Sequence, residues 1–209
     1  YFKREFDFEV KLDDEKDCPR YSGGILKNIH VGESPAWLVD YMKSIGERSI
    51  NNLVDISNYV LFELGHPTHI FDLDRLPENK ILVRRARQGE KIITLDEKEY
   101  ELNKNNLLIT SDDKPIALAG IMGSLNSSIN DETKNIFIES AYFDPITIRK
   151  SAKSLFLSTE ASKRYERGVD PNGCIDAFAR VVSLICEVTE GELVSEVIDE
   201  YPNQIRSRE

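Results

Sequence analysis

Residues 135–145 read NIFIESAYFDP, and this stretch decides the fold class more than any other part of the chain. The apolar run over residues 135–140 is suited to a buried strand. Asp144 followed by Pro145 is a typical start of a helix. Because the chain passes directly from a buried strand into a helix, we expect strands and helices to share one core.

The elements before this stretch are two helices followed by short strands. The first helix is expected over residues 34–46, with Ser34 as its N-cap and Pro35 at its first position, and the second over residues 52–64, ended by Gly65. Strands are expected at residues 21–29, where Gly23 and Gly24 indicate a bulge or a close approach, and at 81–83, 91–95, 99–102, 107–110 and 116–119.

Helices return after residue 145. One starts at Pro145, a short one is capped by Ser158 or Thr159 and ends at Gly168, and a long one starts at Asp170 and Pro171 and is closed by Gly191. A final strand is expected over residues 193–198. This order predicts a mixed α+β fold, with a central β-structure of several short strands flanked by helices.

The two ends of the chain are predicted to lie outside the main domain. Residues 2–10 alternate like a strand, and the acidic stretch 13–17 is typical of a linker. We therefore expect residues 1–18 to be the edge of a preceding module, residues 19–200 to form one domain, and residues 201–209 to be a C-terminal linker. A chain that opens at Tyr1 in the middle of a strand is interpreted as a fragment of a longer protein.

Composition limits the classes of function. The 209 residues carry a net charge of −10, which argues against coating of nucleic acid but allows the receipt of one nucleic-acid end, for which the locally basic segment 145–168 is suited. No apolar run approaches the roughly 20 residues of a membrane span. The cysteines, Cys18, Cys174 and Cys186, form no CxxC pair, so reduced thiols and a cytoplasmic location are expected.

Three short segments combine chemistry with local structure. In residues 65–72, His66 and His69 belong either to a functional loop or to a tight turn with a surface His66 and a His69 bonded to Asp72. Their HxxH spacing, with no third ligand nearby, does not indicate a metal site. Gly120 and Gly123 either let backbone N–H groups approach a ligand or mark a bulge. Glu139 is either an exposed or ion-paired carboxylate or a buried one that needs a donor.

Five motifs, in this order, resemble the B3/B4 editing module of the bacterial phenylalanyl-tRNA synthetase β subunit. They are NNLVDISNYV (51–60), GHPTHIFDLDRL (65–76), IALAGIMGS (116–124), NIFIESAYFDP (135–145) and LSTEASKRYERGVDP (157–171). The resemblance implies a hydrolytic domain, separate from the aminoacylation site, that clears tyrosine mistakenly attached to tRNA(Phe).

Site residues follow from this resemblance, position by position. It implies catalytic roles for His69, Glu139 and Thr159, with Glu139 recognising the tyrosine hydroxyl. It implies that the substrate-binding residues are Arg48, Pro67, Gly120, Gly123 and Ala161, and it gives His66 no role. It also implies two partners, the acceptor end of tRNA(Phe) and the α subunit. No metal or cofactor is expected in this chain, whereas the parent enzyme uses ATP and magnesium.

The physical case for the implied activity is that phenylalanine and tyrosine differ by one hydroxyl. A pocket that favours phenylalanine rejects tyrosine only modestly, whereas an acceptor such as Glu139 placed for that hydroxyl rejects phenylalanine strongly. Two rival hypotheses remain open at this point. One is a non-catalytic module for tRNA docking or subunit assembly, and the other is an amino-acid sensor in which Arg48 binds the carboxylate.

Overall fold

The structure, a computed structural model, describes residues 8–205 and contains two five-stranded sheets. The first has the order β1 (Glu9–Leu12), β4 (Lys80–Arg85), β7 (Leu107–Ser111), β8 (Lys114–Leu118) and β9 (Met122–Gly123). The second has the order β11 (Glu192–Leu193), β2 (Arg20–Lys27), β10 (Ile136–Tyr142) and β3 (Thr68–Asp72), and β12 (Ile198–Glu200) also pairs with β2. A separate hairpin joins β5 (Lys91–Ile93) to β6 (Glu99–Glu101).

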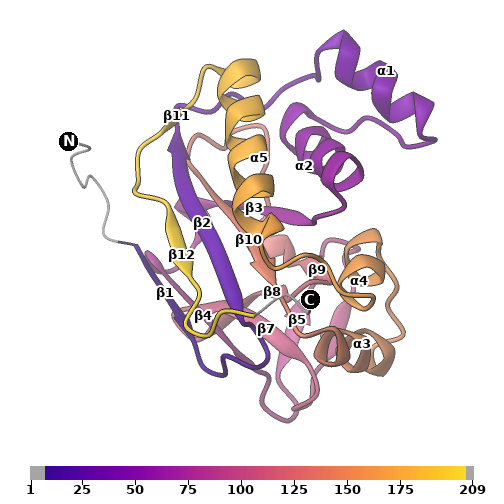
Figure 1. The fold of residues 1–209 in the computed structure, drawn as a ribbon, viewed down its shortest axis with the longest axis vertical. Coiled ribbons are helices and arrows are strands. Elements are labelled where there is room, and N and C mark those ends of the chain that lie inside the picture. The colour runs from indigo at the N-terminus through magenta and orange to yellow at the C-terminus, as the bar shows by residue number, and fades with distance from the viewer. Residues whose placement is uncertain (1–7, 206–209) are drawn as a thin grey trace.

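Helices cover the second sheet on one side and the end of the first sheet on the other (Figure 1). The long helix α5 (Gly173–Thr189) lies against β10 and β2, and α2 (Asn52–Leu64) packs beside it, with α1 (Ala36–Ser44) outside α2. Helices α3 (Pro145–Ser154) and α4 (Glu160–Tyr165) pack on each other near β7. Two single-turn helices, η1 (Leu73–Arg75) and η2 (Leu125–Ser127), complete the fold. The mixed α+β class is therefore confirmed.

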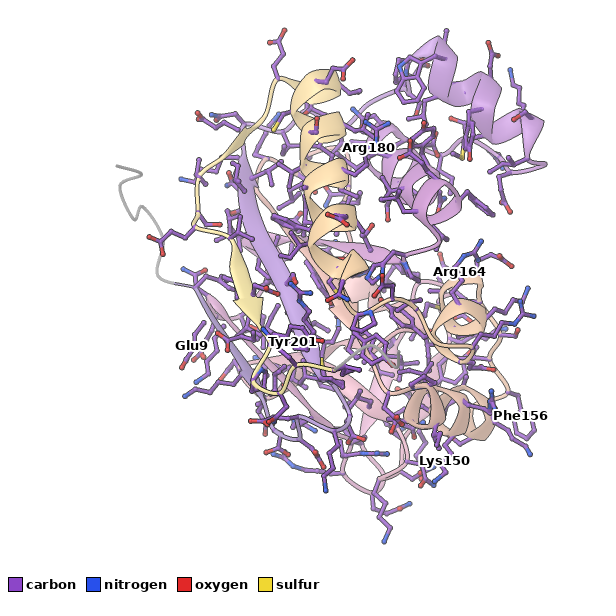
Figure 2. All side chains as sticks on the ribbon, viewed as in Figure 1. Glu9, Lys150, Phe156, Arg164, Arg180 and Tyr201 are labelled. Atoms are coloured by element: carbon purple, nitrogen blue, oxygen red, sulfur yellow. The ribbon has the colours of Figure 1, made fainter. Side chains whose placement is uncertain are left out.

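The turn after α3 presents an aromatic side chain to solvent. Phe156 is 96% exposed, and its backbone has φ of 56°, in the left-handed region that disfavours bulky residues. Figure 2 shows its side chain pointing away from the ribbon, beyond α3 and clear of Lys150. By contrast, Arg180 on α5 is held against α2 by a hydrogen bond from its Nε to Glu63 at 2.8 Å.

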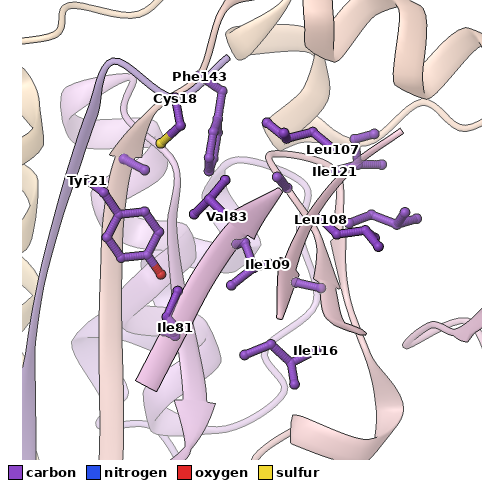
Figure 3. Packing of buried hydrophobic residues seen from close by; sticks show 14 of the residues in the cluster. Cys18, Tyr21, Ile81, Val83, Leu107, Leu108, Ile109, Ile116, Ile121 and Phe143 are labelled. Carbon is purple, nitrogen blue, oxygen red and sulfur yellow. The ribbon is translucent and has the colours of Figure 1, made fainter. Parts of the chain in front are cut away.

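The buried apolar side chains form two clusters on opposite faces of β10. Phe137 and Ala141 belong to the cluster between the two sheets, which Figure 3 shows around Tyr21, Val83 and Ile109. Ile136 and Ile138 belong instead to the cluster beneath α2 and α5. Since side chains alternate along a strand, Glu139 shares the face of Phe137 and points between the sheets.

Two glycines let β2 lie close to its neighbours. A Cβ on Gly23 would lie 2.5 Å from Cζ of Phe137, and one on Gly24 would lie 2.7 Å from Cζ of Phe178. The pairing of β2 with β10 runs without a register shift from residue 20 to residue 26. Of the two interpretations of this pair from sequence, the close approach is confirmed and the bulge is wrong.

Several predicted boundaries need correction. Pro35, not Ser34, is the N-cap of α1, because the Ser34 hydroxyl donates to Asp55 at 2.6 Å instead. The long helix starts at Gly173 after Asn172, later than predicted, and the final strand is divided into β11 and β12. The most consequential error is at residues 65–72, where a loop was expected but β3 extends the second sheet.

The acidic N-terminal stretch contacts the body of the fold. Asp17 is buried, receives hydrogen bonds from the Arg85 guanidinium, and accepts one from the Thr147 hydroxyl at 2.9 Å. Strand β1 runs parallel to β4, whereas residues 2–7 of the expected strand lie outside the described residues. The division of the chain at residues 18 and 200 stays a prediction.

Candidate functional site

A small cavity lies between the two sheets, and we call it the Glu139 cavity. Strands β10 and β3 pair so that Glu139 stands directly opposite His69. The turn between β8 and β9 and helix α4 complete the walls. Its volume is about 60 Å³, and its lining residues are Pro67, Thr68, His69, Ile109, Ala117, Leu118, Gly120, Ile121, Met122, Gly123, Glu139, Ala161 and Tyr165.

Glu139 is a buried carboxyl with one protein hydrogen bond. It is 4% exposed, and the Tyr21 hydroxyl donates to its Oε2 at 2.9 Å. Burial raises the pKa of Glu139 to about 8, although the bond from Tyr21 acts in the opposite direction. At neutral pH the side chain is therefore mostly a neutral acid, which can accept one hydrogen bond and donate another. A charge-assisted hydrogen bond from a tyrosine hydroxyl would require the ionised form of Glu139.

His69 presents an uncharged imidazole to the same cavity. Its ring is half-buried and lies edge-on to Phe71, with ring centroids 4.5 Å apart. Burial lowers the pKa of His69 to about 4, so the ring is neutral at pH 7. Within residues 8–205 it makes no hydrogen bond to the protein. Both ring nitrogens are thus available to a water molecule or a ligand.

The tight-turn interpretation of this histidine pair is wrong. The Asp72 carboxylate accepts from the Thr133 hydroxyl at 2.7 Å and from the N–H of Asp74 at 3.0 Å, so it is not bonded to His69. His66 is not on the surface either, since it is only 2% exposed.

Gly120, in the β8–β9 turn, and Gly123, in β9, serve different purposes. Gly120 has φ of +66° and sits in a turn closed by the Ile121 N–H and the Leu118 carbonyl at 3.0 Å, and in the described chain its own N–H donates to no protein acceptor. Gly123 has no room for a side chain, because its Cβ would lie 2.5 Å from Cε1 of His69. Gly120, Gly123 and His69 all line the same cavity.

Two predicted site residues are not in the lining. Thr159 caps α4: its hydroxyl accepts from the Ser162 N–H at 3.1 Å and donates to the carbonyl of Ile121 at 2.9 Å. It therefore holds a wall of the cavity from behind. Arg48 lies in the exposed connection between α1 and α2 and is absent from the lining. The other predicted residues, Pro67, His69, Gly120, Gly123, Glu139 and Ala161, are brought together.

Sequence reasoning missed two tyrosines. Tyr165 donates from its hydroxyl to the carbonyls of Pro67 at 3.2 Å and Ala141 at 3.1 Å, which ties α4 to the strands. Tyr21 reaches Glu139 diagonally, because the residue directly opposite Glu139 is Gly23, and Tyr21 lies two residues from Gly23 on β2. A glycine beside a buried acidic residue is the signal that sequence could have offered, but only with the register known.

The described residues contain no group of three or more His, Cys, Asp or Glu side chains arranged to hold a metal ion. The three cysteines are free thiols. Over residues 8–205, no helix is long and apolar enough to cross a membrane.

Fold and cavity together define a class, an α+β domain with a small cavity between two sheets that is lined by Glu139 and His69. The family model of the B3/4 domain matches residues 17–190, and the chain belongs to this family. This confirms the resemblance found from the five motifs.

Curated relatives are phenylalanine–tRNA ligase β subunits. The chain is 44% identical to the β subunit of Thermotoga maritima over 208 residues, which are 100% of this chain and 26% of the relative. It is 48% identical to the β subunit of Desulfotalea psychrophila over 196 residues, which are 93% of this chain and 24% of the relative. The chain thus spans about a quarter of the length of these relatives. An N-terminal fragment of the phenylalanyl-tRNA synthetase β subunit from Pyrococcus horikoshii shares the fold, with a TM-score of 0.51 and 15% identity over 77% of this chain and 50% of that one.

Proposed function

We propose that this chain is the editing domain of a phenylalanine–tRNA ligase β subunit and hydrolyses tyrosyl-tRNA(Phe). The observation that carries the proposal is the placement of Glu139 and His69 side by side on paired strands, both in the lining of one cavity. Glu139 is suited to recognise a phenol hydroxyl, and His69 is suited to position a water molecule. The relatives named above supply the parent enzyme in which such an activity would belong.

Recognition of tyrosine rests on the carboxyl oxygen of Glu139 that has no hydrogen-bond partner in the described chain. Tyr21 occupies Oε2, so Oε1 remains for the hydroxyl of the substrate. Phenylalanine would leave that oxygen buried without a partner, and an unpaired buried polar group costs about 1–3 kcal/mol. The cavity of about 60 Å³ must widen to admit a phenol ring, and Met122 is the flexible, half-buried lining side chain that can move.

Hydrolysis requires a positioned water and a site for the developing oxyanion. The neutral His69 accepts a proton from water, whose oxygen attacks the ester carbonyl carbon. The Gly120 N–H is a donor for the resulting oxyanion. The ester C–O bond then breaks, and the leaving ribose oxygen takes the proton back from the imidazolium. Thr159 acts at a distance by holding the Ile121 carbonyl.

The parent enzyme implied by the relatives adds partners and a location. We propose the acceptor end of tRNA(Phe) and the α subunit as partners, with ATP and magnesium used by the ligase centre outside this chain. The protein is then a cytoplasmic translation enzyme. The basic surface of residues 145–168 is suited to guide the incoming strand.

One observation bears on the rival hypotheses. An amino-acid sensor needs a cation for the free carboxylate, but no arginine or lysine lines the cavity and Arg48 is exposed elsewhere. An ester has no such carboxylate, so the uncharged cavity favours the esterified substrate. A non-catalytic docking module would not need a cavity lined by an imidazole that has no protein partner among residues 8–205.

The deciding experiment is a deacylation assay with tyrosyl-tRNA(Phe) and phenylalanyl-tRNA(Phe). Wild-type protein should release tyrosine selectively, and Glu139→Ala should lose the selectivity. His69→Ala should lose the rate with either ester. Release of both amino acids at equal rates by the wild type would sink the recognition argument, and no release in the assembled two-subunit enzyme would favour the docking module.

A further inference from the structure

Tyr21 is a fully buried tyrosine that contacts Glu139 from outside the Glu139 cavity. Its side chain is absent from the lining of the cavity, and Figure 3 shows its ring among the buried side chains between the two sheets. Its hydroxyl donates to Oε2 of Glu139 at 2.9 Å. Any effect of Tyr21 on a ligand in the cavity must therefore act through Glu139.

The direction of this hydrogen bond is set by Tyr21. Among residues 8–205, Glu139 is the one hydrogen-bond partner of the Tyr21 hydroxyl. If this hydroxyl accepted a proton from Glu139 instead, its own proton would be buried without an acceptor, which is unfavourable. Burial, followed by the charge of Glu139, raises the pKa of Tyr21 well above its ordinary value, so the hydroxyl keeps its proton at neutral pH. Oε2 is therefore the accepting oxygen of the carboxyl group.

The groups around Glu139 favour its neutral form. His69 on β3 is neutral at pH 7, no lysine or arginine is in the lining, and β7 and β8 contribute only aliphatic side chains to it. Tyr165 on α4 and Cys18 before β2 are uncharged, because burial and the charge of Glu139 raise the pKa of both. A buried carboxylate without a cation is unfavourable, so the carboxyl group keeps its proton.

The proton of this carboxyl group has one suitable position. A neutral carboxyl group donates from the oxygen that carries the proton and accepts at the other. Since Oε2 accepts from Tyr21, the proton lies on Oε1, which has no protein partner in the described part of the chain. A ligand that reaches Oε1 therefore meets a hydrogen-bond donor.

We propose that Tyr21 is a positioning residue that holds the Glu139 proton on Oε1, so that Glu139 recognises tyrosine by donating a hydrogen bond to its phenol oxygen. This inference rests on the proposed function. The substrates are then esters of amino acids whose ring carries an oxygen acceptor at the position of the tyrosine hydroxyl. Phenylalanine has no such acceptor and leaves the Oε1 proton buried without a partner.

The variant Glu139→Gln distinguishes a donor from an acceptor at this position. The glutamine carbonyl can accept from Tyr21, and its NH₂ group then takes the place of the Oε1 proton. The measured quantity is the ratio of kcat/KM for deacylation of tyrosyl-tRNA(Phe) to that of phenylalanyl-tRNA(Phe). Glu139→Gln should keep this ratio within about threefold of the wild type, whereas Glu139→Ala should lose it. An equal loss in both variants would mean an accepting carboxylate and overturn the proposal.

The pH dependence of the same ratio is a second readout. A group with a pKa of about 8 stays mostly neutral between pH 6 and 7, so the wild-type ratio should be constant over this interval. If ionised Glu139 were the acceptor, its ionised fraction and the ratio would rise about tenfold across that unit. The amino group of the ester titrates alike in both substrates and cancels in the ratio. A tenfold rise would therefore overturn the proposal.

The variant Tyr21→Phe keeps the ring and removes the hydrogen bond. Because that bond lowers the pKa of Glu139, the carboxyl group should titrate at higher pH in the variant, as followed by carbon NMR of the Glu139 carboxyl group. Its proton can then lie on either oxygen, so the rate with the tyrosyl ester should fall at least threefold while the rate with the phenylalanyl ester stays unchanged. An equal fall for both esters with an unmoved titration would mean a structural role and overturn the proposal.

Tyr59→Phe is the matched control. It removes a tyrosine hydroxyl that donates to Glu63 at 3.1 Å on α2, outside the lining of the cavity, and it should change neither the ratio nor the titration of Glu139.

The measurements also separate this inference from the proposed function. Selective release of tyrosine by the wild type but not by Glu139→Gln would overturn the donor role and keep the function. If the wild type releases neither amino acid, the function is wrong, and the NMR titration still decides the inference. A Glu139 that titrates below pH 6 overturns it, and one that titrates near pH 8 and higher in Tyr21→Phe supports it.

Discussion

Two buried carboxyl groups in this molecule have opposite surroundings. Asp55, fully buried in the first turn of α2, accepts hydrogen bonds from the hydroxyls of Ser34 at 2.6 Å and Ser49 at 2.5 Å and from the Ile50 N–H at 2.9 Å. Glu139, nearly as buried, accepts one. A saturated carboxylate fixes the chain around it, whereas an unsaturated one keeps bonding capacity for a ligand. The number of filled positions thus separates a structural acid from a candidate binding acid.

The largest expected effect comes from breaking the saturated site. Asp55→Asn removes the charge that three donors share, and hydrogen bonds to charged groups contribute about 1.5–3 kcal/mol each. We expect the free energy of unfolding to fall by about 3 kcal/mol, measured by urea denaturation. The matched change Glu139→Gln should cost far less at pH 6. A larger loss for Glu139→Gln than for Asp55→Asn would reverse the comparison.

The second prediction is a pH optimum of stability near 6.5. Folding raises the pKa of Glu139 to about 8. Between about pH 4.5 and 8, Glu139 is therefore protonated in the folded state and ionised in the unfolded state. The free energy of unfolding falls as pH rises through this window. Folding lowers the pKa of His66 and of His69 to about 4, so their contribution falls as pH decreases from 6.5.

From pH 6.5 to 8 the loss should reach about 2 kcal/mol, since one pKa unit corresponds to about 1.4 kcal/mol. Thermal denaturation across pH 4–9 measures the profile. Glu139→Gln should flatten the alkaline side. It should also steepen the acidic side above about pH 4.5, because the two histidines then act there without the opposing contribution of Glu139. An unchanged alkaline side in this variant would remove Glu139 as its cause.

The third prediction concerns the contact between Gly123 and His69. Gly123→Ala places a Cβ at 2.5 Å from the His69 ring, so the imidazole must shift. We expect deacylation to fall at least tenfold, with about 1 kcal/mol lost in stability. Gly89→Ala, at an open position where φ of +77° makes alanine strained, is the control for lost stability without a clash and should leave deacylation unchanged. Normal activity in Gly123→Ala would separate His69 from the reaction.

The smallest effect, and one of opposite sign, is expected at Phe156. This residue has left-handed backbone and an almost fully exposed ring, so neither packing nor either carboxyl depends on it. Phe156→Gly should raise the free energy of unfolding by up to about 1 kcal/mol, because glycine relieves the strain of the left-handed backbone. The greater conformational entropy of glycine in the unfolded chain offsets part of this gain. Destabilisation would show that the ring makes contacts in solution. Deacylation of tyrosyl-tRNA(Phe) is the control measurement and should not change.

Much of the fold followed from local patterns, but the pairing of distant strands did not. The helix over residues 52–64 was predicted because the apolar spacing and Gly65 are local signals, and the structure has α2 with these bounds. Strand β3 was missed because Pro67 and two histidines are typical of a loop. Its strand conformation comes from pairing with β10, more than 60 residues away.

For the candidate site as well, single residues could be proposed from the sequence, but their positions relative to one another could not. The resemblance proposed Glu139 and His69 separately, and only the register of β3 on β10 sets them opposite each other. The partner of Glu139 could not be predicted, because Tyr21 reaches it across Gly23 on a third strand. Arg48, proposed from the resemblance alone, lies on the surface, and its role stays a prediction.

The walls of the Glu139 cavity come from segments spread along the chain, from Pro67 to Tyr165, and its acid is held by Tyr21. On the ribosome, where synthesis proceeds at about 5–20 residues per second, these segments emerge over many seconds. No nascent chain that stops before α4 holds the complete cavity. The Glu139 cavity is therefore complete only when most of the domain has been synthesised.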